Sequence, residues 1–151
     1  MKIITNTEKH NHAQEIKSLL VWAESCYLCT SFIDKQGVEL LLPALMEASK
    51  KHDFKVSIYS NGEHKYTKPW VVKTLNKLTY VNHLVVKPDG RRLHSKIYLF
   101  VNGSQYIAII GSANLTGNGL VNNEELSLKY SGDTDSDQFL ELFQYLSSLA
   151  R

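Results

Sequence analysis

The chain has 151 residues, of which 43% are hydrophobic and 21% charged, and a formal net charge of +2. This length and balance are typical of one ordinary globular domain and exclude an intrinsically disordered or a membrane-spanning protein. A charge of +2 gives no strong overall field, so any affinity for phosphate must come from local clusters. We therefore expect a single domain over residues 1–151, without a membrane partner. The N-terminus shows no secretory signal, which makes the cytoplasm the expected location.

Helical and strand patterns alternate in the first half of the sequence. Apolar residues at helical spacing predict helices over residues 13–23, 37–50 and 68–78. Short apolar runs between these helices predict strands over residues 26–33, 54–59 and 83–86. Such alternation requires crossover connections, which indicates an α/β fold with a largely parallel sheet that is covered by helices on both faces.

The second half has a different pattern. Two apolar runs, Leu93–Val101 and Tyr106–Ile110, are joined through Asn102-Gly103, a dipeptide typical of the tight turn of a β-hairpin. These runs should form neighbouring antiparallel strands. A further strand is expected over residues 125–130, and apolar spacing predicts a closing helix over residues 139–149.

Residues that can carry chemistry lie around this hairpin. His94 and Lys96 are two positions apart on an expected strand, so their side chains should leave the same face. An imidazole can act as a nucleophile, and a fixed cation beside it would attract a negatively charged substrate. The loop 111–119 is rich in small residues and in amide and hydroxyl donors, which suits it to stabilise a negatively charged oxygen. Glu125 begins the next expected strand, within reach of the imidazole.

Three short motifs resemble, in order and spacing, the catalytic signature of the phospholipase D superfamily: His94-x-Lys96, Gly111-Ser112-x-Asn114 and Asn123-x-Glu125. The resemblance implies a phospholipase D-like α/β/α sandwich with a central mixed, largely parallel sheet. It also implies a phosphodiesterase that uses no metal ion or other cofactor. His94 would then be the nucleophile that forms a phosphohistidine, with Lys96 and Asn114 on the non-bridging oxygens. Glu125 would orient the imidazole, and Ser112 would support that network.

The chemistry of this family needs two histidines, one that attacks and one that protonates the leaving oxygen. This chain has one His-x-Lys motif. The resemblance therefore implies a homodimer with an active site shared at the interface, where both copies of His94 face one phosphate.

One position departs from the family pattern, because Val101 stands where an aspartate is usual. Some restriction-endonuclease-like members resemble this chain in that respect, which favours the nuclease branch with one motif per chain. The expected substrate is DNA or another nucleic acid. Two alternatives stay open: a phospholipid hydrolase or phosphatidyl transferase, and a catalytically idle nucleic-acid-binding domain of the same fold.

Basic residues near the expected active face are candidates for binding a nucleic-acid backbone. Arg91 and Arg92 immediately precede the catalytic strand and are assigned to substrate binding. The flanking loops add Lys65, Lys68 and Lys87, for which an ordinary solvated surface is the alternative interpretation. The aromatic residues of this region are interpreted as core rather than as stacking surfaces: Tyr66, Trp70 and Tyr98.

The remaining histidines and the cysteines are not assigned to chemistry. Most of the other histidines are expected at the surface: His10, His12, His52, His64 and His83. The pair His10 and His12 lacks a third ligand, so no metal site is predicted. Cys26 and Cys29 are three apart on an expected strand and point to opposite faces, which favours structural roles.

Overall fold

The structure is a computed structural model that describes residues 1–150. In chain order the strands are β1 (Lys2–Thr5), β2 (Ser25–Cys29), β3 (Lys55–Asn61), β4 (Val81–Val86), β5 (Ile97–Asn102), β6 (Gln105–Gly111) and β7 (Leu126–Asp133). The helices are α1 (His12–Trp22), α2 (Lys35–Ala48), α3 (Pro69–Asn76) and α4 (Asp137–Ser148), with short helical turns η1 (Glu63–Lys65) and η2 (Asn118–Asn122).

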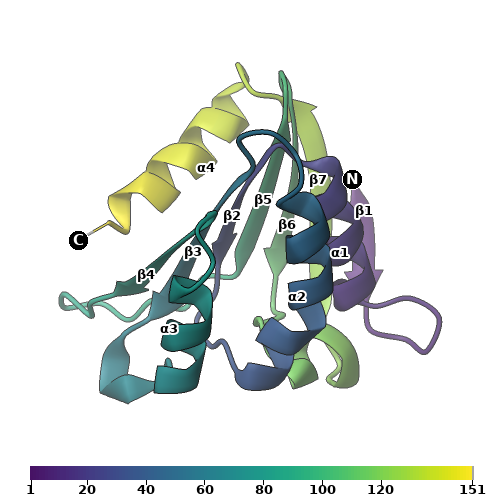
Figure 1. Ribbon diagram of the computed structural model, residues 1–151. Coiled ribbons are helices and arrows are strands. Elements are labelled where there is room, and N and C mark those ends of the chain that lie inside the picture. Colours follow the sequence, from purple (N-terminus) through teal and green to yellow (C-terminus); the bar gives the residue numbers. More distant parts are fainter. Residues whose placement is uncertain (151) are drawn as a thin grey trace.

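All seven strands form one sheet in the order β1-β7-β6-β5-β2-β3-β4. Helices α1, α2 and α3 cover one face of the sheet, and α4 alone crosses the other face (Figure 1). The α/β/α layering predicted from the sequence is thus confirmed, as is the alternation of helices and strands through β4.

The sheet is mixed, as predicted, but the expectation that it is largely parallel is wrong. Only β2–β3 and β3–β4 are parallel pairs, whereas the other four strand pairs are antiparallel. The predicted hairpin reverses the chain at Gly103, where φ is +58°, so β5 and β6 run side by side in opposite directions. Strand β1 then adds to the free edge of β7, also antiparallel.

Local sequence explains where the helices begin. The side chain of Asn11 accepts a hydrogen bond from the Gln14 N–H at 2.9 Å at the start of α1. Asp34 does the same for the Gly37 N–H at 2.8 Å at the start of α2. Such caps satisfy backbone donors that have no partner inside the helix. Helix α3 begins at a proline, whose missing N–H costs nothing at that position.

Two predicted strands are longer than those in the structure. The expected strand 26–33 ends at Cys29, and the expected strand Leu93–Val101 begins only at Ile97. The short strand β1 was not predicted, because four residues show too little alternation. These differences matter for function, since the shortened strand ends become loops along one edge of the sheet.

Two apolar layers make the core, one on each face of the sheet. The larger layer lies under α1–α3 and includes Tyr98, which is 1% exposed as predicted. The smaller layer lies under α4, around Leu99 and Leu146. The prediction of core positions for Tyr66 and Trp70 is wrong, because these side chains are 36% and 38% exposed. In the part of the chain that is described, no helix is long and apolar enough to cross a bilayer.

Candidate active site

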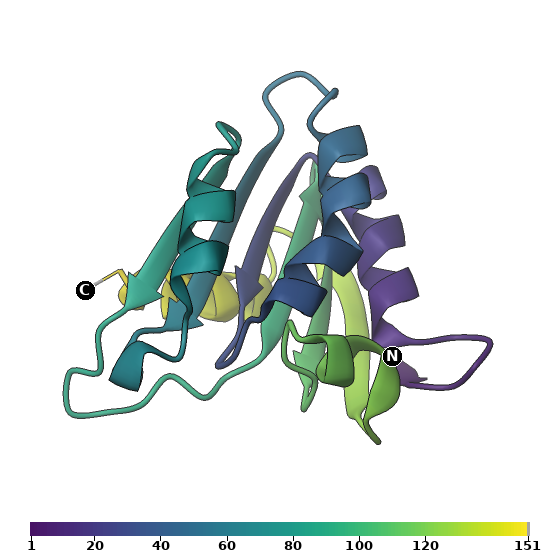
Figure 2. The ribbon, with the colours of Figure 1, turned by 60° about the horizontal axis from the view of Figure 1, so that its bottom comes forward.

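The three motifs meet at one edge of the sheet. His94 and Lys96 lie in the segment that enters β5, Asn114 follows β6, and Glu125 immediately precedes β7. The antiparallel register brings the start of β5 beside the end of β2, and the end of β6 beside the start of β7. Figure 2 shows the connecting loops gathered along this edge, with the segment before β5 running beneath the strand ends. We call this edge the motif edge.

His94 and Lys96 are not on a strand, yet their side chains meet as expected. Lys96 Nζ lies 3.3 Å from His94 Nδ1 and donates to the His94 carbonyl oxygen at 2.8 Å. The imidazole is exposed, whereas Lys96 is partly buried. Burial lowers the pKa of Lys96, and the carboxylate of Glu125 opposes that shift. The site therefore presents an accessible imidazole with a cation fixed at its side.

Asn114 is held by its side-chain oxygen, and its amide nitrogen has no hydrogen-bond partner among residues 1–150. Its side-chain oxygen Oδ1 accepts a hydrogen bond from the Phe32 N–H at 3.1 Å. Thr30 Oγ1 also lies 3.2 Å from this oxygen, beyond the end of β2. Because Phe32 N can only donate, the atom facing it must be the oxygen, which leaves the NH2 group to point elsewhere. The amide is thus a preset donor for an anion.

The loop that carries Asn114 is fixed by close packing. At Gly37, on the first turn of α2, a Cβ atom would lie 2.0 Å from the Leu115 carbonyl oxygen. At Gly119 it would lie 2.5 Å from the Asn114 carbonyl oxygen. Only glycine allows these approaches. The Asp34 carboxylate also accepts from the Gly117 N–H at 3.1 Å, which ties the loop to the start of α2.

Glu125 and Ser112 form a network of their own. Ser112 Oγ donates to Glu125 Oε1 at 2.6 Å, and Asn123 Nδ2 donates to Oε2 at 3.2 Å. Ser112 Oγ also accepts from the Leu126 N–H at 3.0 Å. The structure gives Glu125 no hydrogen bond to His94 within the described chain. The imidazole instead has Lys96 at Nδ1, so the orienting contact expected from Glu125 is not made within one copy.

A second buried network lies behind the motif edge, and the sequence interpretation missed it. His12 is 0% exposed, contrary to the expected surface position. Its Nδ1 lies 2.7 Å from Asn6 Oδ1 and its Nε2 lies 2.8 Å from Ser127 Oγ. Asn6 Nδ2 in turn donates to the carbonyl oxygens of Gly119 and Asn123, at 2.9 and 3.0 Å. The network thus holds the segment between Asn114 and Glu125 at two points, in its middle at Gly119 and near its end at Asn123.

The protonation of His12 follows from these partners. Because the Asn6 amide group donates to two carbonyls, its oxygen faces His12 and accepts, so Nδ1 of His12 carries the proton. Nε2 then accepts from the Ser127 hydroxyl. Burial lowers the pKa of His12, which favours this neutral form, while Glu125 acts in the opposite direction. The neighbouring sequence gave no sign of this role.

The two arginines predicted to bind substrate differ in their contacts. Arg92, assigned to substrate binding, donates twice to the Glu63 carboxylate, at 3.2 and 2.7 Å. This contact lowers the pKa of Glu63 and leaves Arg92 as a link between two loops. Arg91 is exposed and lines a hollow with Tyr145 and Leu149.

The thiols and the remaining histidines show no catalytic arrangement. Cys26 and Cys29 are free and buried, and burial raises the pKa of each to about 12, which supports a structural role. His83 is also more buried than expected, with Nε2 2.8 Å from Ser60 Oγ. Within residues 1–150 no three potential metal ligands gather at one point, and His10 instead contacts Glu15 at 2.9 Å.

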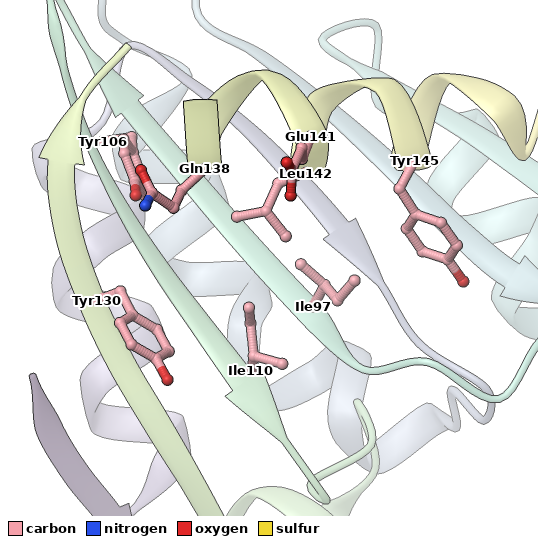
Figure 3. A pocket seen from close by; sticks show the side chains of 8 residues that line it. All are labelled: Ile97, Tyr106, Ile110, Tyr130, Gln138, Glu141, Leu142 and Tyr145. Carbon is pink, nitrogen blue, oxygen red and sulfur yellow. The ribbon is translucent and has the colours of Figure 1, made fainter. Parts of the chain in front are cut away.

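A hollow lies under α4, on the face of the sheet opposite α1–α3 (Figure 1). It has a volume of about 530 Å³ and a mostly apolar lining that includes Ile97, Ile110, Tyr130 and Leu142 (Figure 3). Tyr145, at one end of this hollow, shares a hydrogen bond with Ser95, the residue between His94 and Lys96. The apolar surface under α4 is thus continuous with the motif edge.

Comparison with known proteins adds three structures. NucT from Helicobacter pylori is 17% identical, with 98% of this chain and 93% of NucT covered and a TM-score of 0.69. Nuc from Salmonella typhimurium, a phospholipase D family member, is 19% identical, with 99% and 95% covered and a TM-score of 0.71. A polyphosphate kinase from Porphyromonas gingivalis is 17% identical, with 97% of this chain and 22% of the kinase covered and a TM-score of 0.62. These likenesses show a common fold.

The sequence comparisons give the family itself. No curated protein matches the chain. The family described as cardiolipin synthase, PLD-like domain, matches residues 3–147, nearly the whole sequence. This span includes all three motifs and all seven strands, except for Lys2 at the start of β1. The chain therefore belongs to the phospholipase D-like family, as its motifs indicated.

Proposed function

We propose that the chain is a phosphodiesterase that cleaves DNA or another nucleic acid without a metal ion. The observation that carries the proposal is the pairing of an exposed imidazole with a fixed cation, His94 Nδ1 and Lys96 Nζ at 3.3 Å. Asn114 adds a free amide at the same edge. An ammonium and an amide held in place stabilise charge that builds up on the non-bridging oxygens of a phosphate.

The reaction needs two histidines in two steps. First, a ring nitrogen of His94 bonds to phosphorus while the bond to the leaving sugar oxygen breaks, and that oxygen takes a proton from a second histidine. Water then attacks the phosphorus, passes a proton to the second histidine and releases a phosphomonoester from His94. Both rings return to their starting protonation, so no further reactant is required.

The second histidine is proposed to be His94 of another copy, in a homodimer with a shared site. The surface around α4 supports this proposal, because Leu140, Phe143 and Tyr145 are 47%, 38% and 39% exposed there. Tyr130, across the hollow, is 38% exposed. Single chains rarely leave so many large apolar side chains open on one face. Since Tyr145 contacts Ser95, a partner on this face would reach the motif edge.

Mixing two kinds of chain tests the shared site. Wild-type protein is unfolded and refolded together with an equal amount of His94→Ala protein, and cleavage is compared with the same total amount of wild type. If each site needs both imidazoles, activity falls to about one quarter, because only dimers of two wild-type chains are active. A value of about one half would show independent sites and contradict the shared one.

Cleavage in excess chelator tests the function. Plasmid and single-stranded DNA are incubated with wild type, His94→Ala and His52→Ala. His52 serves as the matched control because its side chain is 95% exposed and its ion-pair partner, Asp53, belongs to none of the three motifs. We expect His94→Ala to lose activity by about 10³-fold or more and His52→Ala to match wild type. Equal cleavage by all three proteins would contradict the assignment.

Two other functions predict different results in assays of cleavage and binding. Phosphatidyl transfer or phospholipid hydrolysis is favoured by the description of the matching family as cardiolipin synthase, PLD-like domain. Phosphatidylglycerol vesicles that are converted by wild type but not by His94→Ala would make a phospholipid the substrate. Tight DNA binding without any cleavage would indicate the catalytically idle domain.

Domain extent and location are part of the same proposal. We take residues 1–151 to act as one domain, since the strands form a single sheet. The two buried, unpaired thiols suit a reducing compartment such as the cytoplasm.

A further inference from the structure

An aromatic cluster stands beside the motif edge, beyond the ends of β2 and β3. The rings of Phe32 and Tyr66 meet with centroids 5.1 Å apart and planes inclined by 65°. Their side chains are 39% and 36% exposed, so both rings keep a large part of their surface open to solvent. Trp70, at the start of α3, is 38% exposed. We call Phe32 and Tyr66 the aromatic pair.

The aromatic pair is coupled to the candidate active site through the backbone. The Phe32 N–H donates to Asn114 Oδ1 at 3.1 Å, so the residue that orients the catalytic amide also carries one of the exposed rings. A group that lies on the Phe32 ring is therefore bound by the residue that also fixes the amide proposed to hold the scissile phosphate.

Tyr66 is presented by a strained turn that is tied to the catalytic segment. The two residues before it, His64 and Lys65, have φ of 49° and 58°, in the left-handed region that residues with a Cβ rarely adopt. Glu63 starts this turn, and its carboxylate accepts hydrogen bonds from Nε and Nη2 of Arg92. Arg92 lies two residues before His94. The turn thus holds Tyr66 beside Phe32 and next to the segment that carries the nucleophile.

Charge around the aromatic pair is positive and largely uncompensated. Lys35 Nζ lies 5.2 Å from the centre of the Trp70 ring. Lys65 and Lys68 are exposed, and neither they nor Lys35 form an ion pair within residues 1–150. The one acidic neighbour in the turn, Glu63, is neutralised by Arg92. A ligand of this surface should combine negative charge with flat apolar faces.

We infer that the aromatic pair stacks on an unpaired base next to the scissile phosphate, so that the preferred substrate is a single-stranded nucleic acid. The inference rests on the proposed nuclease function and names its substrate class. A duplex hides the faces of its bases within the stack, whereas a single strand exposes them to aromatic side chains, and the lysines follow the phosphates. The exposed rings should therefore bind a single strand more tightly than a duplex of the same sequence.

Binding measurements in the His94→Ala background test the inference without turnover. A fluorescent oligothymidylate, the same strand paired with oligoadenylate, and an abasic strand of equal length are titrated by anisotropy. Phe32→Leu and Tyr66→Leu keep apolar bulk but remove the ring, whereas Phe32→Tyr and Tyr66→Phe keep it. Thermal unfolding of each variant checks that the fold is retained.

We expect each leucine variant to bind the single strand about 5- to 100-fold more weakly, and the two aromatic variants to stay within about twofold of the parent. Duplex and abasic-strand binding should be weak in the parent and unchanged by the substitutions. Leucine variants that bind the single strand as tightly as the parent, or a parent that binds the abasic strand equally well, would overturn the inference. In those cases wild-type cleavage in chelator would still support the nuclease, whereas no cleavage and no binding would end both proposals.

Discussion

Residues 94–125 supply the groups that would touch a phosphate, whereas many of the groups that hold them come from residues 6–63. The imidazole, the ammonium and the free amide belong to the first region. In the second region, Phe32 orients Asn114, and Glu63 anchors Arg92. Asn6 and His12 fix the segment that leads to Glu125. The comparison teaches that the reacting region is short and recognisable, while its geometry depends on distant residues without a motif.

Apart from loss of His94 itself, the largest effect should come from removing a charge in the reacting region. Lys96→Met takes away the cation that lies 3.3 Å from His94 Nδ1, and we expect kcat/KM for DNA cleavage to fall by about 10²- to 10³-fold. Lys50→Met is the control, because its ammonium is exposed and contacts Glu47 far along α2. Similar activity in both variants would place the reacting groups elsewhere.

A smaller effect should follow from a change in the supporting region. His12→Phe breaks the contacts to Asn6 and Ser127, and should lower the unfolding free energy by about 1–3 kcal/mol. Because His12 touches no substrate group, kcat should fall by about 10-fold while KM changes little. His12→Gln should restore part of the unfolding free energy and part of kcat. His10→Ala, at the exposed neighbour, should change neither quantity. A rise in KM with unchanged kcat would mean that His12 acts on substrate binding instead.

The pH dependence of stability should come from two buried histidines outside the reacting region, His12 and His83. Burial lowers the pKa of His12, and lowers that of His83 to about 4, whereas an unfolded histidine titrates near pH 6.5. Below pH about 6.5 the unfolded chain binds more protons, so stability is complete above that pH and is lost as the pH falls toward 4.

Urea unfolding at pH 7 and pH 4.5 measures this loss. His83→Gln should reduce the difference between the two pH values by on the order of 2 kcal/mol, since the variant has no imidazole to protonate. His52→Gln, at a fully open position, should leave the difference as in wild type. An unchanged difference in His83→Gln would show that burial of this ring does not control the acid response.

The smallest effect is expected at the cysteines of the supporting region. Burial raises the pKa of both thiols to about 12, so almost no thiolate exists at pH 8. The folded protein should react with a disulfide reagent such as dithionitrobenzoate only as it unfolds, and cleavage activity should be unaffected. Rapid labelling of the native chain with loss of activity would contradict a purely structural role for Cys26 and Cys29.

The same comparison explains what the sequence predicted and what it did not. The helices and most strands follow from periodicity, and the motif edge follows from the hairpin, because β5 and β6 bring His94 and Asn114 together. The degree of parallel pairing was wrong, since periodicity does not reveal that β5 pairs antiparallel with β2, that β7 pairs antiparallel with β6, or that β1 joins β7. The buried position of His12 was missed because its partners Asn6 and Ser127 are six and 115 residues away. Such contacts leave no local pattern.

The central claim, a covalent bond between His94 and phosphorus, is tested most directly by trapping it. DNA with radiolabelled internal phosphates is mixed with protein in excess chelator, quenched in alkaline denaturant, and the protein is separated by electrophoresis. We predict label on wild type and His52→Ala that is lost on acid treatment, and none on His94→Ala. Cleavage by wild type without any trapped label, or equal label on His94→Ala, would contradict the account.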